Sequence, residues 1–169
     1  VGAMQCAYFR KWRAVNILSF IGTFVLYTLW FDKFYDTQAT VLEYPFEMPA
    51  ALTGLSIFFA VFLTLPLLNG LKNRNKAAKD DVMLVVANSG VTFYYLYTIL
   101  EPVSRTVLAW SAVVLAGAHL GMMFVVRVRA RKDRDLQAVL LTIGLVFVTV
   151  AMPLFFSMNI LSVAWAAQS

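Results

Sequence analysis

The stretch from Arg10 to Asp36, RKWRAVNILSFIGTFVLYTLWFDKFYD, decides the fold class of this chain. A basic cluster precedes an apolar run over residues 14–31, and an acidic, aromatic segment follows it. As a helix, the run would be about 27 Å long, close to the roughly 30 Å hydrocarbon core of a bilayer. It is long for the apolar part of a signal peptide, and bulky Trp30 and Phe31 stand where small residues would precede a cleavage site. We therefore expect a retained transmembrane helix.

The same alternation of apolar run and polar segment repeats along the whole chain. Hydrophobic residues make up 61% of the 169 residues and charged residues 14%, against roughly 45–50% and 25% in soluble domains. The predicted spans cover residues 14–31, 49–71, 82–100, 106–126 and 136–156, and residues 160–167 look like the start of another. The sequence thus predicts an all-α, polytopic transmembrane helix bundle, with five full spans plus the start of a sixth apolar segment. We treat residues 1–169 as a single module.

Lysine and arginine predict the orientation of the spans. All but two of the 14 lysines and arginines fall on one side of the predicted path, and the exceptions are Lys33 and Arg105. Short loops rich in these residues stay in the cytoplasm. We therefore expect a multi-pass protein of the bacterial cytoplasmic (inner) membrane, with the N-terminal end of the chain inside. This placement accounts for the net charge of +5 with the lipid bilayer as partner and without nucleic acid.

The two ends suggest a larger protein. The chain begins at Val1 without a methionine and stops shortly after the apolar residues 160–167. We expect a piece of a longer polytopic protein, whose other helices are its partners.

No catalytic signature is found in the sequence. It has no glycine-rich phosphate loop and no paired-cysteine motif, and its one histidine and one cysteine are His119 and Cys6. We expect no enzyme activity, no metal site and no cofactor.

His119 is the one readily ionisable side chain within a predicted span. Such residues are costly in a membrane and suggest function, here proton handling. A neutral imidazole is cheaper and bonds across helices, so an interhelical hydrogen bond is the simpler interpretation. Gly117 and Gly121 would let a partner helix approach beside it. Ala112 and Ala116 extend this small-residue pattern, and Ala50 and Gly54 form a weaker one.

Asn88-Ser89-Gly90 places polar groups near the middle of the third span. Together with His119 and the prolines Pro66 and Pro153, Asn88 is a candidate for a mid-membrane polar path, as in the broken helices of transporters. Interhelical hydrogen bonds and ordinary proline kinks are the alternative, which we favour.

A second candidate lies at the end of the first span. Trp30, Asp32, Tyr35 and Asp36 could form an outer-face surface for a sugar or a lipid head group. The alternative is an aromatic belt at headgroup depth, which needs no ligand.

Two sets of motifs resemble a known family. They are Trp12-Arg13, Gly22-Thr23, Leu26-Tyr27, Trp30 and Phe34-Tyr35 in the first set, and Met152-Pro153-Leu154-Phe155-Phe156 with Ala164-Trp165-Ala166 in the second. They resemble blocks of the bacterial membrane proteins filed as domain of unknown function 2339. The family pattern has an acidic residue three positions after the second-block tryptophan, where this chain has Gln168. No role that needs a carboxylate there is carried over.

The resemblance implies a long polytopic protein without established activity or catalytic residues. The leading hypothesis is a non-enzymatic, structural portion of such a protein. The alternative is part of a transporter or of a machine that handles lipids or glycans, and a membrane enzyme with its catalytic groups elsewhere is a third class.

Overall fold

A computed structural model describes residues 13–35, 47–73, 79–129 and 133–156. This part of the chain is almost entirely helical and contains no strand. The helices are α2 (Arg13–Phe34), α3 (Glu47–Asn73), α4 (Lys79–Leu100), α5 (Arg105–Arg129) and α6 (Arg134–Phe155). All five are long and apolar enough to cross a membrane, which confirms the predicted fold class and each predicted span to within a few residues. The expected sixth segment, residues 160–167, lies outside the described residues.

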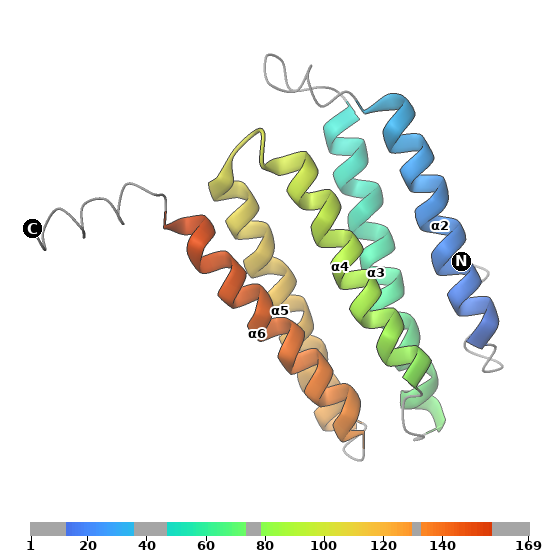
Figure 1. Ribbon diagram of the computed structural model, residues 1–169. Helices are drawn as coiled ribbons and strands as arrows, with labels where there is room; N and C mark the ends of the chain where they lie inside the picture. Colours follow the sequence, from blue (N-terminus) through green and yellow to red (C-terminus); the bar gives the residue numbers. More distant parts are fainter. Residues whose placement is uncertain (1–12, 36–46, 74–78, 130–132, 157–169) are drawn as a thin grey trace, which may run out of the picture.

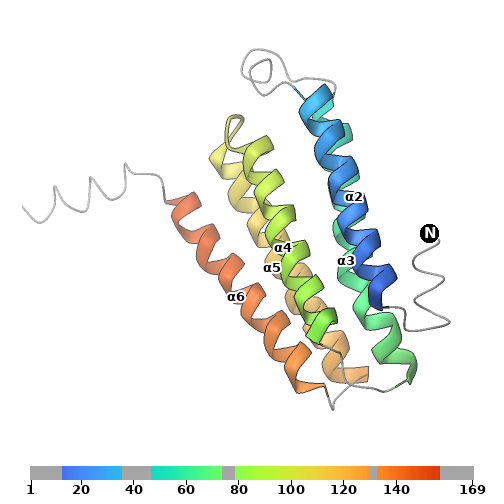
Figure 2. The same ribbon diagram turned by 45° about the vertical axis from the view of Figure 1, so that its right-hand side comes forward.

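The helices run alternately up and down through one bundle (Figure 1). In both views α2 and α6 lie at opposite edges (Figures 1 and 2). α5 and α6 form the most extensive contact, while α4 contacts all four other described helices. α4 is therefore the central helix, and polar groups on it can reach several neighbours.

The turn between α4 and α5 forms where Glu101-Pro102 predicts a break. The backbone N–H of Ser104 donates to the Leu100 carbonyl at 2.8 Å, and the N–H of Leu108 donates to the Ser104 carbonyl at 3.1 Å. Proline suits such a turn because it has no N–H to leave unsatisfied. The Glu101 carboxylate lies 3.5 Å from the Arg105 guanidinium across this turn.

Proline does not interrupt the other two helices in which it occurs. α3 remains helical through Pro66. In α6, Pro153 lies in the last turn, and the helix ends at Phe155. At the other end of α6, Asp133 accepts a hydrogen bond from the Leu136 N–H at 3.3 Å, as an N-cap residue does.

α5 and α6 are in close contact at Gly144. A Cβ atom built on Gly144 would lie 2.8 Å from Cγ and Cδ2 of Leu120 and 3.5 Å from the Ala116 carbonyl oxygen. Ala116 itself is buried. Small residues on both helices therefore allow this contact, as is usual between membrane helices.

The expectation that Gly117 and Gly121 pack against a neighbouring helix was wrong for the described residues. Both glycines are exposed, and a Cβ on either would meet no atom within 4 Å. The physical reason is their direction on α5: Ala112 and Ala116 face the bundle, while the glycine pair points away from it. Of the weaker pattern on α3, Gly54 lies against the Tyr27 ring, and a Cβ added to this glycine would be 3.7 Å from Cε2 of the ring. Ala50 is exposed.

Candidate functional site

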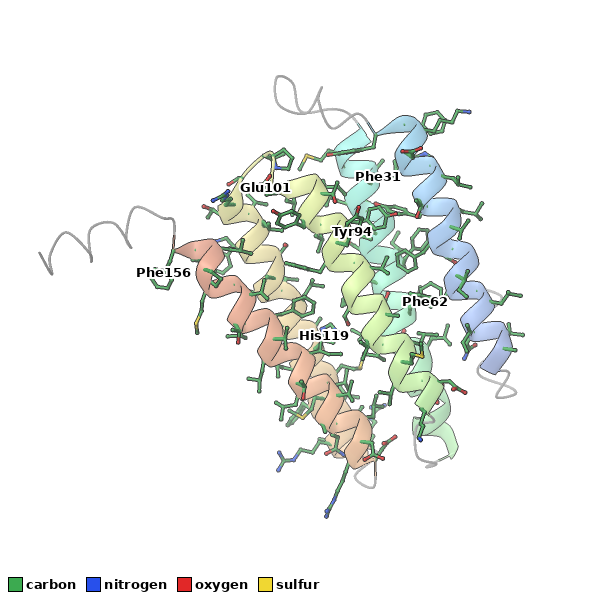
Figure 3. All side chains as sticks on the ribbon, viewed as in Figure 1. Phe31, Phe62, Tyr94, Glu101, His119 and Phe156 are labelled. Atoms are coloured by element: carbon green, nitrogen blue, oxygen red, sulfur yellow. The ribbon has the colours of Figure 1, made fainter. Side chains whose placement is uncertain are left out.

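Four polar side chains are buried together on α4 and α5. Asn88, Ser89 and Thr92 of α4 are 0%, 3% and 2% exposed, and His119 of α5 is 0% exposed. Asn88 and Thr92 are one helical turn apart and therefore share a face of α4. His119 lies near mid-height in the bundle (Figure 3). The two candidate polar-path residues, Asn88 and His119, are thus both inside the protein.

Both ring nitrogens of His119 have partners. Nε2 lies 2.7 Å from the Ser89 hydroxyl oxygen on α4, and Nδ1 lies 2.7 Å from the Leu115 carbonyl oxygen one turn earlier on α5. The ring also contacts Phe59 of α3 and Phe147 of α6, each with its centroid 5.6 Å away. The interhelical hydrogen bond expected for this histidine is present, and its partner is Ser89.

The hydrogen bonds determine the tautomer of a neutral His119. A carbonyl oxygen only accepts, so Nδ1 must carry the proton that is donated to Leu115. In the neutral ring Nε2 is then an acceptor, and the Ser89 hydroxyl donates to it. The Ser89 hydroxyl also lies 2.8 Å from the Val85 carbonyl, but its single proton serves one acceptor at a time. A neutral ring suits this apolar interior, where an unpaired charge would be costly.

The Asn88 side chain forms a hydrogen bond from α4 to α3 through its nitrogen, but not through its oxygen. Its Nδ2 donates to the Phe59 carbonyl at 3.1 Å. Its Oδ1 and the Thr92 hydroxyl, by contrast, are buried without a hydrogen-bond partner among the residues that the structure describes. Unpaired polar atoms are expensive away from water, so these two oxygens are the atoms of the cluster with capacity for a further small polar molecule.

A second level of hydrogen bonds lies nearer the Trp30 end of the bundle. Tyr27 of α2 donates to the Ala51 carbonyl of α3 at 3.0 Å. Thr28 of α2 lies 2.6 Å from the Tyr95 hydroxyl of α4, and it also donates to the Phe24 carbonyl at 2.6 Å. Because Thr28 has one hydroxyl proton, Tyr95 must be the donor to it. Together with the bonds of Asn88 and His119, these contacts join each consecutive pair of helices from α2 to α5.

The three described residues of the candidate outer-face surface differ in exposure. Asp32 is exposed and Trp30 half-buried, but Tyr35 is only 6% exposed. Tyr35 stacks on Phe31, with ring centroids 4.4 Å apart, and it belongs to a buried cluster with Ala51, Ile99 and Leu108. Its inclusion in an exposed surface was therefore wrong. Asp36 lies outside the described residues.

An open groove lies beside this end of the bundle, between α2 and α3. Its volume is about 410 Å³, and its lining is mostly apolar; the lining residues are Thr23, Leu26, Tyr27, Trp30, Ala50, Gly54 and Phe58. These residues recur at intervals of three or four on each helix, so they form one face of α2 and one face of α3. The sequence marked Trp30 as a candidate, but it did not indicate that α3 supplies the opposite wall.

A comparison with protein families identifies the family of this chain. The model of a family described as "Predicted membrane protein (DUF2339)" matches residues 1–169. The chain belongs to this family. The five membrane-capable helices and the family description agree that it is a membrane protein. No curated protein and no solved structure matches the chain.

Two members of the polar cluster were not singled out from the sequence. Ser89 was noted only as a neighbour of Asn88, and Thr92 was not considered. Thr92 had an available signal, since a residue four positions after Asn88 must share its helix face. The pairing of Ser89 with His119 had none, because it depends on how α4 and α5 are rotated against each other.

Proposed function

We propose that this chain is a non-enzymatic, structural helical module of a larger polytopic membrane protein. The observation that carries the proposal is the use of the buried polar groups: His119 bonds Ser89, and Asn88 bonds the Phe59 carbonyl. In lipid, apolar contact alone does not drive helices together, so close packing and interhelical hydrogen bonds must hold a bundle. Interhelical hydrogen bonds join the consecutive helices α2, α3, α4 and α5. Close packing joins α5 to α6, so both kinds of interaction are present.

A double-mutant cycle tests this structural role. Ser89→Ala and His119→Leu would be made singly and together, and the free energy of unfolding measured in bicelles. We expect a coupling energy of about 0.6 kcal/mol, the average for interhelical hydrogen bonds in a membrane protein, and at most about 1.7 kcal/mol. Ser56→Ala is the control, because the Ser56 hydroxyl is exposed and donates to the Leu52 carbonyl within its own helix, α3. Additive effects of the two substitutions would contradict the proposal.

The proposed setting is the inner membrane of a bacterium, with the chain entering α2 from the cytoplasm. The distribution of lysine and arginine supports this orientation. The test uses a chain without Cys6 and with single cysteines at Thr106 and Val128, exposed residues near opposite ends of α5. An impermeant thiol reagent added outside should modify Thr106→Cys and spare Val128→Cys. The opposite result would reverse the orientation.

A second candidate function is a mid-membrane polar path in a transporter or in a lipid- or glycan-handling machine. The unpaired Asn88 Oδ1 and Thr92 hydroxyl favour it, because a polar molecule passing through the bundle would find hydrogen-bonding partners there. This role requires water to reach the Asn88–Thr92 face, whereas the structural role does not. Thiol accessibility on α4 therefore separates the two functions.

A further inference from the structure

The α2–α3 groove faces outward from the bundle. Leu26 on its rim is 69% exposed, and Trp30 and Gly54 are half-buried. The Tyr27 ring is held in place by its hydrogen bond to the Ala51 carbonyl and by edge-to-face packing on Phe58, with centroids 5.9 Å apart. Aromatic side chains held by these contacts therefore line the groove. Its open side faces the lipid that would surround a membrane helix.

The shape of this groove suits a flexible chain better than another helix. The small residues of α3 would be the natural place for a second helix to approach. However, the Tyr27 ring already lies over Gly54, where an added Cβ would be 3.7 Å from the ring. The remaining space is the part of the α2–α3 groove beside the Tyr27 ring. In a bilayer, a lipid acyl chain can enter this space.

Apolar contact alone would not hold a particular lipid there. Lipid tails are as apolar as leucine, so the groove offers no hydrophobic gain over the surrounding bilayer. A preference must come from close van der Waals packing and from the headgroup. The headgroup contact is therefore what decides whether this groove selects a lipid.

Lys33 does not line the groove itself, but it lies one helical turn beyond Trp30 on α2, within reach of a headgroup at that end. Leu26, Trp30 and Lys33 follow one another at intervals of four and three residues, so they form one stripe along α2. Lys33 is exposed, and its Nζ lies 5.4 Å from the centroid of the Phe34 ring. Asp32 is about 100° further round the helix, away from this stripe. The groove thus has tryptophan and a cation at one end, where a lipid phosphate would lie.

We propose that the α2–α3 groove binds one acyl chain of a phosphate-bearing lipid, with the phosphate at Lys33. The proposal goes beyond the structural role of the module and does not depend on it. It assigns to Trp30 and Lys33 a recognition role at the membrane surface. Asn88 and His119 take no part in it.

Photo-crosslinking in lipid nanodiscs tests the proposal. A trace of phosphatidylglycerol with a diazirine on its acyl chain would be irradiated with the protein, and the adducts mapped by mass spectrometry. We expect adducts to concentrate on the groove residues of α2 and α3, and to be sparse at Val114, an equally lipid-accessible position of α5 that is 69% exposed. Diacylglycerol with the same photoreactive chain should label the groove about fivefold less, because it lacks the phosphate.

Two substitutions, each with a matched control, test the groove and the headgroup contact separately. Gly54→Leu places a side chain in the groove and should reduce groove labelling about tenfold. Gly90→Leu is its control, because Gly90 is exposed on α4 and a Cβ added there would have no atom within 4 Å. Lys33→Gln should reduce labelling by phosphatidylglycerol about fivefold, while Arg105→Gln should leave it unchanged.

Three outcomes would overturn the proposal. They are even labelling of α2, α3 and α5; equal labelling by phosphatidylglycerol and diacylglycerol; and replacement of lipid adducts by crosslinks to another helix or a second copy of the chain. Because Lys33 is exposed, Lys33→Gln remains informative if Gly54→Leu fails to fold.

Discussion

Nε2 of His119 lies 2.7 Å from the Ser89 hydroxyl oxygen, and this contact joins α5 to α4 in the interior of the bundle. On the other side of the ring, Nδ1 meets a carbonyl oxygen that can only accept. The proton arrangement of this pair therefore follows from the chemistry of its partners, and it can be observed directly.

We predict that neutral His119 carries its proton on Nδ1. ¹⁵N magic-angle-spinning NMR of the labelled protein in lipid separates protonated from unprotonated ring nitrogens, and the single histidine removes any assignment problem. Ser89→Ala should change the Nε2 signal and leave Nδ1 bonded to Leu115. A neutral ring with its proton on Nε2 would contradict the hydrogen-bond pattern.

Gly144→Val should destabilise the protein by about 1–3 kcal/mol, because a side chain there overpacks the α5–α6 contact. The atoms nearest to an added Cβ are Cγ and Cδ2 of Leu120 at 2.8 Å. The measurement is the free energy of unfolding in bicelles. Gly117→Val is the control, since its Cβ would meet nothing within 4 Å, and it should lie within about 0.5 kcal/mol of the wild type. Equal losses in the two variants would refute this account of the contact.

Tyr95→Phe should destabilise the protein by about 0.5–1.5 kcal/mol, because Thr28 would lose the donor that joins α2 to α4. The same unfolding assay applies. Tyr94→Phe is a close control, because Tyr94 is the preceding residue of α4 and is 65% exposed, and it should have little effect. If Tyr94→Phe were the more damaging change, the assignment of α2–α4 contacts would be wrong.

The span boundaries were predictable because they depend on local properties. Length and apolar composition indicate a helix that can cross a bilayer, and α4 ends at Leu100, where the predicted span 82–100 also ends. The helices extend beyond the apolar runs in places; α5, for example, continues to Arg129. A charged residue ends the apolar pattern without ending the helix, so hydropathy underestimates such ends.

It was harder to predict from the sequence which neighbouring helix each helix face would contact. His119 was expected to bond across helices, and it does. The Gly117–Gly121 pair was expected to pack beside it, yet both glycines point away from the described bundle. Sequence spacing defines which residues share a face, but the rotation of each helix against its neighbours depends on all the contacts together. Gly144, which does make the close contact, has no small-residue partner at the usual spacing in α6 to mark it.

The most direct test of the structural role is water access to the polar cluster. Single cysteines would replace Ser89, Ala112 and Thr106 in a chain without Cys6, and a small thiol-reactive methanethiosulfonate would be added from each side of the membrane. Ser89 and Ala112 are 3% and 0% exposed, whereas Thr106 is exposed near an end of α5. A structural role predicts that Ser89→Cys reacts as slowly as Ala112→Cys from both sides. Modification of Ser89→Cys as fast as that of Thr106→Cys, from either side, would contradict it and favour the polar path.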